Sequence, residues 1–154
     1  MKRILLAILC LGVVVRLAGA QAVDTPAPPG NYVPSLGDIM SAMQLRHFKL
    51  WFAGRLKNWD LAAYELDRIK SSFADAMGFY PGIPVADMTA MGPPAQQIDE
   101  AIKAKDSKEF ARAFGDLTVA CNSCHQAIGR GFIVVQVPTS SPFSNQSFAP
   151  AASK

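Results

Sequence analysis

The chain has 154 residues, of which 50% are hydrophobic and 18% are charged, so it suits one domain and is not a disordered polar chain. The formal net charge of +3 comes from three basic residues near the N-terminus, Lys2, Arg3 and Arg16, because the remainder holds equal numbers of basic and acidic residues. A nucleic-acid-binding protein needs a basic patch, and this charge balance argues against that class of partner.

The first 22 residues have the pattern of a secretory signal peptide. Two basic residues precede an apolar run that reaches Val15, and small residues then provide two overlapping A-x-A cleavage sites, which end at Ala20 and Ala22. Arg16 interrupts the apolar run short of the roughly 20 residues that a membrane span requires, so an uncleaved anchor is the weaker alternative. We therefore expect a periplasmic, exported protein without a membrane span after cleavage.

Residues 23–34 are rich in proline and predict an extended lead-in. Apolar residues then recur at intervals of three and four, which is the period of amphipathic helices. Helices are predicted from Ser35 or Asp38 to about Lys57, over 59–77, over 94–105 and from 107 to about 128.

Capping residues support these helix starts. Ser35 or Asp38 can cap the first helix and Asn58 the second, Pro94 suits the first turn of the third, and Asp106 begins a capping-box pattern. Short links favour antiparallel neighbours, so the expected fold is an all-α antiparallel four-helix bundle over 35–131. An irregular C-terminal tail, residues 132–154, begins with the β-leaning run FIVVQV.

The motif Cys121-Asn122-Ser123-Cys124-His125 is a C-x-x-C-H signature, which is typical of covalent haem c attachment. On a helix, two cysteines three residues apart lie on one side, where their sulfurs can form thioethers to the haem vinyl groups. The adjacent His125 can then bind the iron as proximal ligand.

Two other uses of this cysteine pair are less well supported. A zinc site would need two further ligands, and with Cys10 inside the signal peptide and only His47 left, the two thiolates are short of partners. A thioredoxin-like dithiol begins a helix after a strand, whereas this pair lies near the end of a predicted helix.

The chain resembles the class II c-type cytochromes, the four-helix proteins of the cytochrome c′ and c-556 kind. The resemblance covers about Ser35 to Gly131, and its specific motif is Cys121 to His125. It implies one covalent haem c bound through Cys121 and Cys124, with His125 as proximal ligand, a first-helix side chain over the distal face, and in some relatives a homodimer. Chains of that class end soon after the motif, whereas this one continues to Lys154, so we expect a differently covered distal pocket.

The distal ligand can be predicted from helix lengths. At 1.5 Å per residue, His125 lies about 6 Å from the end of the last helix, and Met40, Met43 and His47 lie about 7.5, 12 and 18 Å into the first. Met40 matches best in an antiparallel pair with flush ends. A shift between the helices would favour His47, and Met43 or an open site is a further alternative.

These residues predict a protein without enzymatic activity, an exported monohaem cytochrome with His125 and Met40 as iron ligands that transfers electrons to a redox partner protein. One alternative is a five-coordinate haem protein that binds NO or CO, and another is an accessory subunit of a periplasmic dehydrogenase. Trp51 and Trp59 can pack on the porphyrin or simply in the core. Basic residues of the first helix can pair with haem propionates or lie on a solvated face: Arg46, Lys49 and Arg55.

Overall fold

Four α-helices form in the stretches whose apolar residues have the helical period. The structure is a computed structural model that describes residues 32–84 and 89–151; the predicted signal peptide and residues 23–31 of the lead-in lie outside this range. The helices are α1 (Leu36–Arg55), α2 (Trp59–Phe79), α4 (Gly92–Ala104) and α5 (Ser107–Ala127). Residues 32–84 and 89–151 contain no strand, and the predicted all-α class is confirmed.

The helix ends follow local capping chemistry. Ser35 caps α1 by accepting a hydrogen bond from the Asp38 backbone N–H, and Asn58 caps α2 in the same way. The chain leaves α1 two residues before the predicted end because Lys57 adopts a left-handed conformation with φ 60°. Helix α4 starts at Gly92 rather than Pro94, since prolines in the first turn lose no helical hydrogen bond.

The start of α5 shows one half of the predicted capping box. The Asp106 carboxylate accepts hydrogen bonds from the backbone N–H groups of Lys108 and Glu109, at 2.9 and 3.0 Å. The Glu109 side chain does not return the bond to Asp106, because it pairs with Arg112 at 2.9 Å. The cap is therefore made by the aspartate alone.

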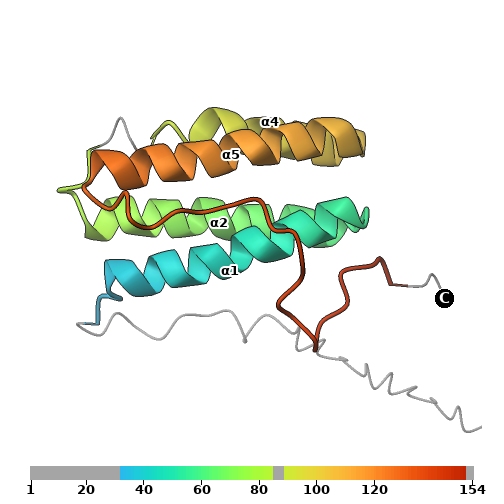
Figure 1. The fold of residues 1–154 in the computed structure, drawn as a ribbon, viewed down its shortest axis with the longest axis horizontal. Coiled ribbons are helices and arrows are strands. Elements are labelled where there is room, and N and C mark those ends of the chain that lie inside the picture. The colour runs from blue at the N-terminus through green and yellow to red at the C-terminus, as the bar shows by residue number, and fades with distance from the viewer. Residues whose placement is uncertain (1–31, 85–88, 152–154) are drawn as a thin grey trace, which may run out of the picture. The chain divides into compact units, whose positions relative to one another are not determined.

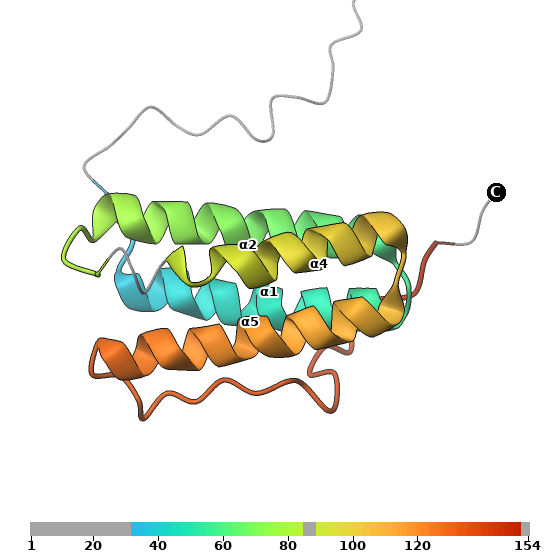
Figure 2. The same cartoon turned by 90° about the horizontal axis from the view of Figure 1, so that it is seen from above.

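The helices lie side by side, and each packs on two others. α1 packs on α2 and α5, and α4 packs on α5 and α2 (Figures 1 and 2). The colour gradient of Figure 1 shows the chain reversing direction from each helix to the next. This arrangement, which belongs to the unit Val33–Lys154, is consistent with the predicted antiparallel bundle.

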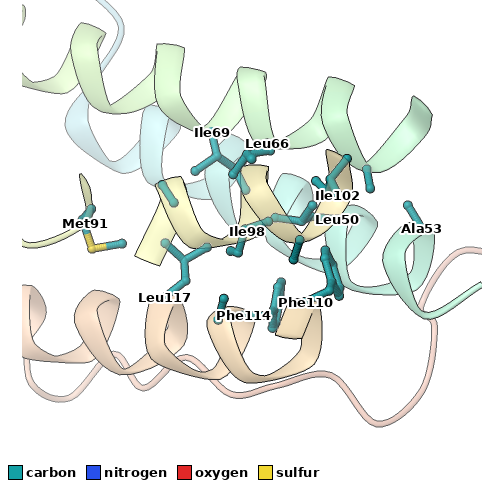
Figure 3. Close-up of a cluster of buried hydrophobic side chains, with 14 of the residues drawn as sticks. Leu50, Ala53, Leu66, Ile69, Met91, Ile98, Ile102, Phe110, Phe114 and Leu117 are labelled. Atoms are coloured by element: carbon teal, nitrogen blue, oxygen red, sulfur yellow. The ribbon is translucent and has the colours of Figure 1, made fainter. Parts of the chain in front are cut away.

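The core between the helices is apolar and close-packed (Figure 3). Its largest fully buried apolar side chains come from all four helices: Leu50, Leu66, Ile69, Ile98, Phe110, Phe114 and Leu117. Burial of each such side chain contributes roughly 1.5–3 kcal/mol. The core lies beside the end of α5 that carries the C-x-x-C-H motif and so provides a rigid support for it.

Gly54 allows α1 to approach α5 closely. A methyl group at this position would overlap the ring of Phe110. We expect Gly54→Ala to lower the free energy of unfolding by about 1–3 kcal/mol, measured by urea denaturation, because a packed core cannot absorb the added volume.

Gly115→Ala is the matched control for this prediction. Gly115 also lies inside a helix, but a methyl group there would meet no atom within 4 Å. The same change should raise the free energy of unfolding by about 0.5–1 kcal/mol through helix propensity. Equal effects at Gly54 and Gly115 would contradict the close approach.

The C-terminal tail returns along the helices after α5 ends. Gly129 begins the return with φ 70°, and residues 133–138 then run extended beside α5 and α1 without forming a strand (Figures 1 and 2). Farther on, Phe148 is buried and packs against Phe52, with ring centroids 5.8 Å apart. The tail, as far as residue 151, is thus part of the folded structure.

None of the helices in the described ranges combines the length and the apolar character that crossing a membrane would require.

Candidate functional site

A cavity of about 390 Å³ lies between the first half of α1, the last turns of α5, the second half of α2 and the returning tail. Its volume is within the range of small-molecule and cofactor sites, roughly 300–1,000 Å³. All the residues that the sequence proposed as haem anchors or iron ligands line this cavity: Met40, Met43, His47, Cys121, Cys124 and His125.

The two motif cysteines lie in the last turns of α5 and face the cavity. Cys121 packs against the main core, and Cys124 packs against a smaller cluster formed by Ile39 and Ala76. Burial raises the pKa of the Cys121 thiol to about 12, and the neighbouring Cys124 adds to the shift. Reactive and redox-active cysteines need a lowered pKa, so this environment argues against a thioredoxin-like dithiol.

His125 is oriented by the tail. Its Nδ1 lies 2.8 Å from the backbone carbonyl oxygen of Ile133. A carbonyl oxygen only accepts, so Nδ1 must carry the hydrogen, and in the neutral ring Nε2 then has the free lone pair. A hydrogen bond of this kind fixes the tautomer and ring orientation of metal-binding histidines. His125 is therefore prepared to bind a metal through Nε2.

Met40 and Met43 bring thioether sulfurs to the wall that α1 contributes. Met40 is half-buried and contacts both the main core and the Ile39–Ala76 cluster against which Cys124 packs. Met43 is 7% exposed and belongs to the main core. Met40 thus shares the Ile39–Ala76 cluster with Cys124, while Met43 is more deeply buried in the main core.

His47 is committed to a buried hydrogen bond. Its Nε2 lies 2.9 Å from the hydroxyl oxygen of Thr118, and that hydroxyl donates to the carbonyl of Phe114. Because the hydroxyl has a single hydrogen, Nε2 of His47 is the donor to Thr118. Ligation through Nε2 would break this bond, which favours Met40 over His47 as distal ligand.

The burial of His47 predicts a pH-dependent stability. Burial lowers its pKa from 6.5 to about 4, so the unfolded chain takes up the proton first as the pH falls. The contribution of His47 to the free energy of unfolding is therefore complete above pH 6.5 and decreases as the pH falls toward 4. Below pH 4 the loss is about 3 kcal/mol, at about 1.4 kcal/mol per pKa unit. Urea denaturation across this pH range measures the loss.

His47→Gln is the variant that isolates this term, since an amide can donate to Thr118 but does not titrate. All carboxylates are common to both proteins, so the difference in free energy of unfolding between wild type and variant reports His47 alone. That difference should favour the wild type less at pH 4.5 than at pH 7. A difference that does not change with pH would disprove the prediction.

Several side chains considered for haem contacts are engaged elsewhere. Trp51 packs against Phe114 in a tilted arrangement, with ring centroids 4.8 Å apart, and, like Trp59, does not line the cavity. Each basic residue of α1 has another partner, in that Arg46 pairs with Glu65, Lys49 lies over Phe143 and Arg55 lies over Trp51. Core packing therefore describes the two tryptophans, and contacts within the protein, including one to the buried Glu65, describe the three basic residues.

Other residues line the cavity although no pattern in the sequence pointed to them. Met91, 3% exposed, adds a third methionine to the cavity wall, and Arg130 adds a positive charge. The tail contributes Ile133, Val134 and Val135. The length of the chain after the motif predicted a differently covered pocket, but only the three-dimensional return of the tail identifies these residues.

Within residues 32–84 and 89–151, no group of three or more His, Cys, Asp and Glu side chains is arranged to hold a metal ion. Comparisons of the chain with protein-family models, with curated proteins and with solved structures found no match.

Proposed function

We propose that the chain is an exported monohaem c-type cytochrome that transfers electrons to a partner protein and catalyses no reaction of its own. The observation that carries this proposal is the shared cavity wall of the C-x-x-C-H motif, where Cys121 and Cys124 face an apolar space and His125 is held with Nε2 free. The spacing of the motif and its surroundings support the same cofactor.

The residues present fit a haem c group. Cys121 and Cys124 would hold it as thioethers, His125 would be the proximal ligand, and Met40 the distal ligand on the opposite helix. Haem iron supplies the one-electron couple between Fe(III) and Fe(II) when it is bound. The protein's part is to keep the ligands fixed and to exclude water, and the close-packed core beside the cavity serves both purposes.

The proposal also covers the antiparallel arrangement of the helices and the export of the protein. We take the four helices as an antiparallel bundle with a folded tail, and the segment 1–22 as a signal for export to the periplasm, where haem c is attached. The balanced charge of the chain after residue 22 supports a protein partner over nucleic acid.

The test is to express the full chain with its signal in a host that attaches haem c, and to record the absorption spectra of the purified oxidised and reduced protein. We expect one haem per chain, retained after denaturation, and the sharp low-spin bands of two strong axial ligands in the reduced form. A colourless protein would overturn the proposal.

A five-coordinate haem protein that binds NO or CO is the second candidate. It is favoured by the cavity wall beside Met40, which is mostly apolar and offers no imidazole except that of His47, already bonded to Thr118. If Met40 does not bind the iron, this apolar wall supplies no other ligand and the sixth position stays open. Spin state separates the two candidates.

A further inference from the structure

We propose that Asn122, the first residue between the two cysteines, is a positioning residue that fixes the proximal histidine by clamping the C-terminal tail. This role rests on the proposed function, in which His125 is the proximal iron ligand. The clamp itself is made of hydrogen bonds within the chain. Through the clamp, Asn122 and the C-terminal tail both help to orient His125.

The clamp consists of two hydrogen bonds between one side chain and one backbone residue. The Asn122 amide donates from Nδ2 to the Val135 carbonyl oxygen at 2.9 Å, and its Oδ1 accepts from the Val135 N–H at 2.8 Å. A primary amide carries a donor and an acceptor side by side, as a peptide unit does. Asn122 therefore pairs with the tail as a neighbouring strand would.

This pairing sets the register of the tail against α5. Asn122 and His125 are three residues apart and so share one face of the helix. Ile133 and Val135 are two residues apart in extended backbone, where alternate residues repeat the same orientation. A tail held at Val135 therefore directs the Ile133 carbonyl to Nδ1 of His125, and a shift by one residue would turn that carbonyl away.

The connection between the helix and the tail is also tied to His125. The backbone N–H of Arg130 donates to the His125 carbonyl at 2.6 Å, and the N–H of Ile133 donates to the Arg130 carbonyl at 2.8 Å. The turn thus fixes one end of the short segment and Asn122 fixes the other. With both ends fixed, the Ile133 carbonyl is oriented toward Nδ1 of His125.

The expected consequence is a fixed tautomer and a more basic ligand. A hydrogen bond of ordinary strength, about 1 kcal/mol, biases the tautomer ratio of His125 toward Nδ1–H by roughly five- to tenfold. Donation from Nδ1 to a carbonyl also strengthens the electron donation of Nε2, which favours Fe(III) over Fe(II). Loss of the clamp should therefore raise the reduction potential of the haem protein.

The experiment compares Asn122→Ala, Asn122→Asp and the control Ser123→Ala in the full chain. Ser123 is the other intervening residue, exposed, and its hydroxyl donates only to the Val119 carbonyl in its own helix. Nitrogen-15 NMR of the histidine rings, on chains prepared without haem, reports the tautomer of His125. Potentiometry on the haem-loaded proteins reports the reduction potential.

We expect both Asn122 variants to lose the Nδ1–H preference by about fivefold or more, while Ser123→Ala matches the wild type. Asn122→Ala should also have a higher reduction potential; in Asn122→Asp the added negative charge opposes that rise, so its readout is the tautomer alone. Asn122→Asp keeps the acceptor and lacks the donor, so it serves if the alanine variant fails to fold. An unchanged His125 tautomer in the folded variants would overturn the clamp. Because the NMR measurement needs no haem, it decides the clamp even if the wild type proves colourless, a result that would count against the proposed function alone.

Discussion

Replacement of both Cys121 and Cys124 by serine should remove covalently bound haem from the exported chain completely. A thioether forms only from a thiol, and a serine hydroxyl of similar size cannot replace it. The two sulfurs face the same cavity from successive turns of α5, so both are placed to react with one porphyrin. Intact-protein mass and visible absorbance after acid denaturation, which releases unattached haem, measure the loss.

The single variants and a neighbouring control sharpen this result. Cys121→Ser and Cys124→Ser each leave one thioether position, so each should retain some covalent haem at reduced yield. Ser123→Ala lies between them on the exposed side of the helix and should keep the full haem content. Covalent haem in the double variant would show that the attachment lies elsewhere, and the proposed site would be wrong.

The sequence predicts most of the fold because its helical signals are local. The period of apolar residues, the caps Ser35, Asn58 and Asp106, and the stop at Gly129 depend on residues within a few positions of each other. The errors at helix ends also have local causes, such as the left-handed Lys57, since lysine does not ordinarily favour that conformation. The close approach at Gly54 needs the partner ring of Phe110 and could not be read from one helix.

The sequence could propose the residues that line the candidate site, but not the contacts that hold them. The motif names Cys121, Cys124 and His125 by spacing alone, and helix length selects Met40. The hydrogen bond from His47 to Thr118 joins residues 71 positions apart, so no local sequence pattern predicts it. The same holds for the tail, whose β-leaning FIVVQV run is bonded at Val135 to a single asparagine side chain of α5.

Met40→Ala is expected to convert the reduced haem protein from low spin to high spin and to lower its reduction potential. A methionine sulfur favours Fe(II), so its loss removes a term that raises the potential. Met40 is half-buried and reaches both the main core and the cluster that Cys124 contacts, which puts it at the level of the motif. Absorption spectra and potentiometry on the purified variant measure both effects.

Met43→Ala and Met91→Ala are the matched controls, because both methionines line the same cavity. Both are more deeply buried, 7% and 3% exposed, so each truncation should cost about 2–5 kcal/mol of stability through the space it leaves. Neither should change the spin state if Met40 is the ligand. A spectral change in Met43→Ala with none in Met40→Ala would reassign the ligand to Met43, whereas a wild type that is already high spin and insensitive to all three changes would favour the gas-binding alternative.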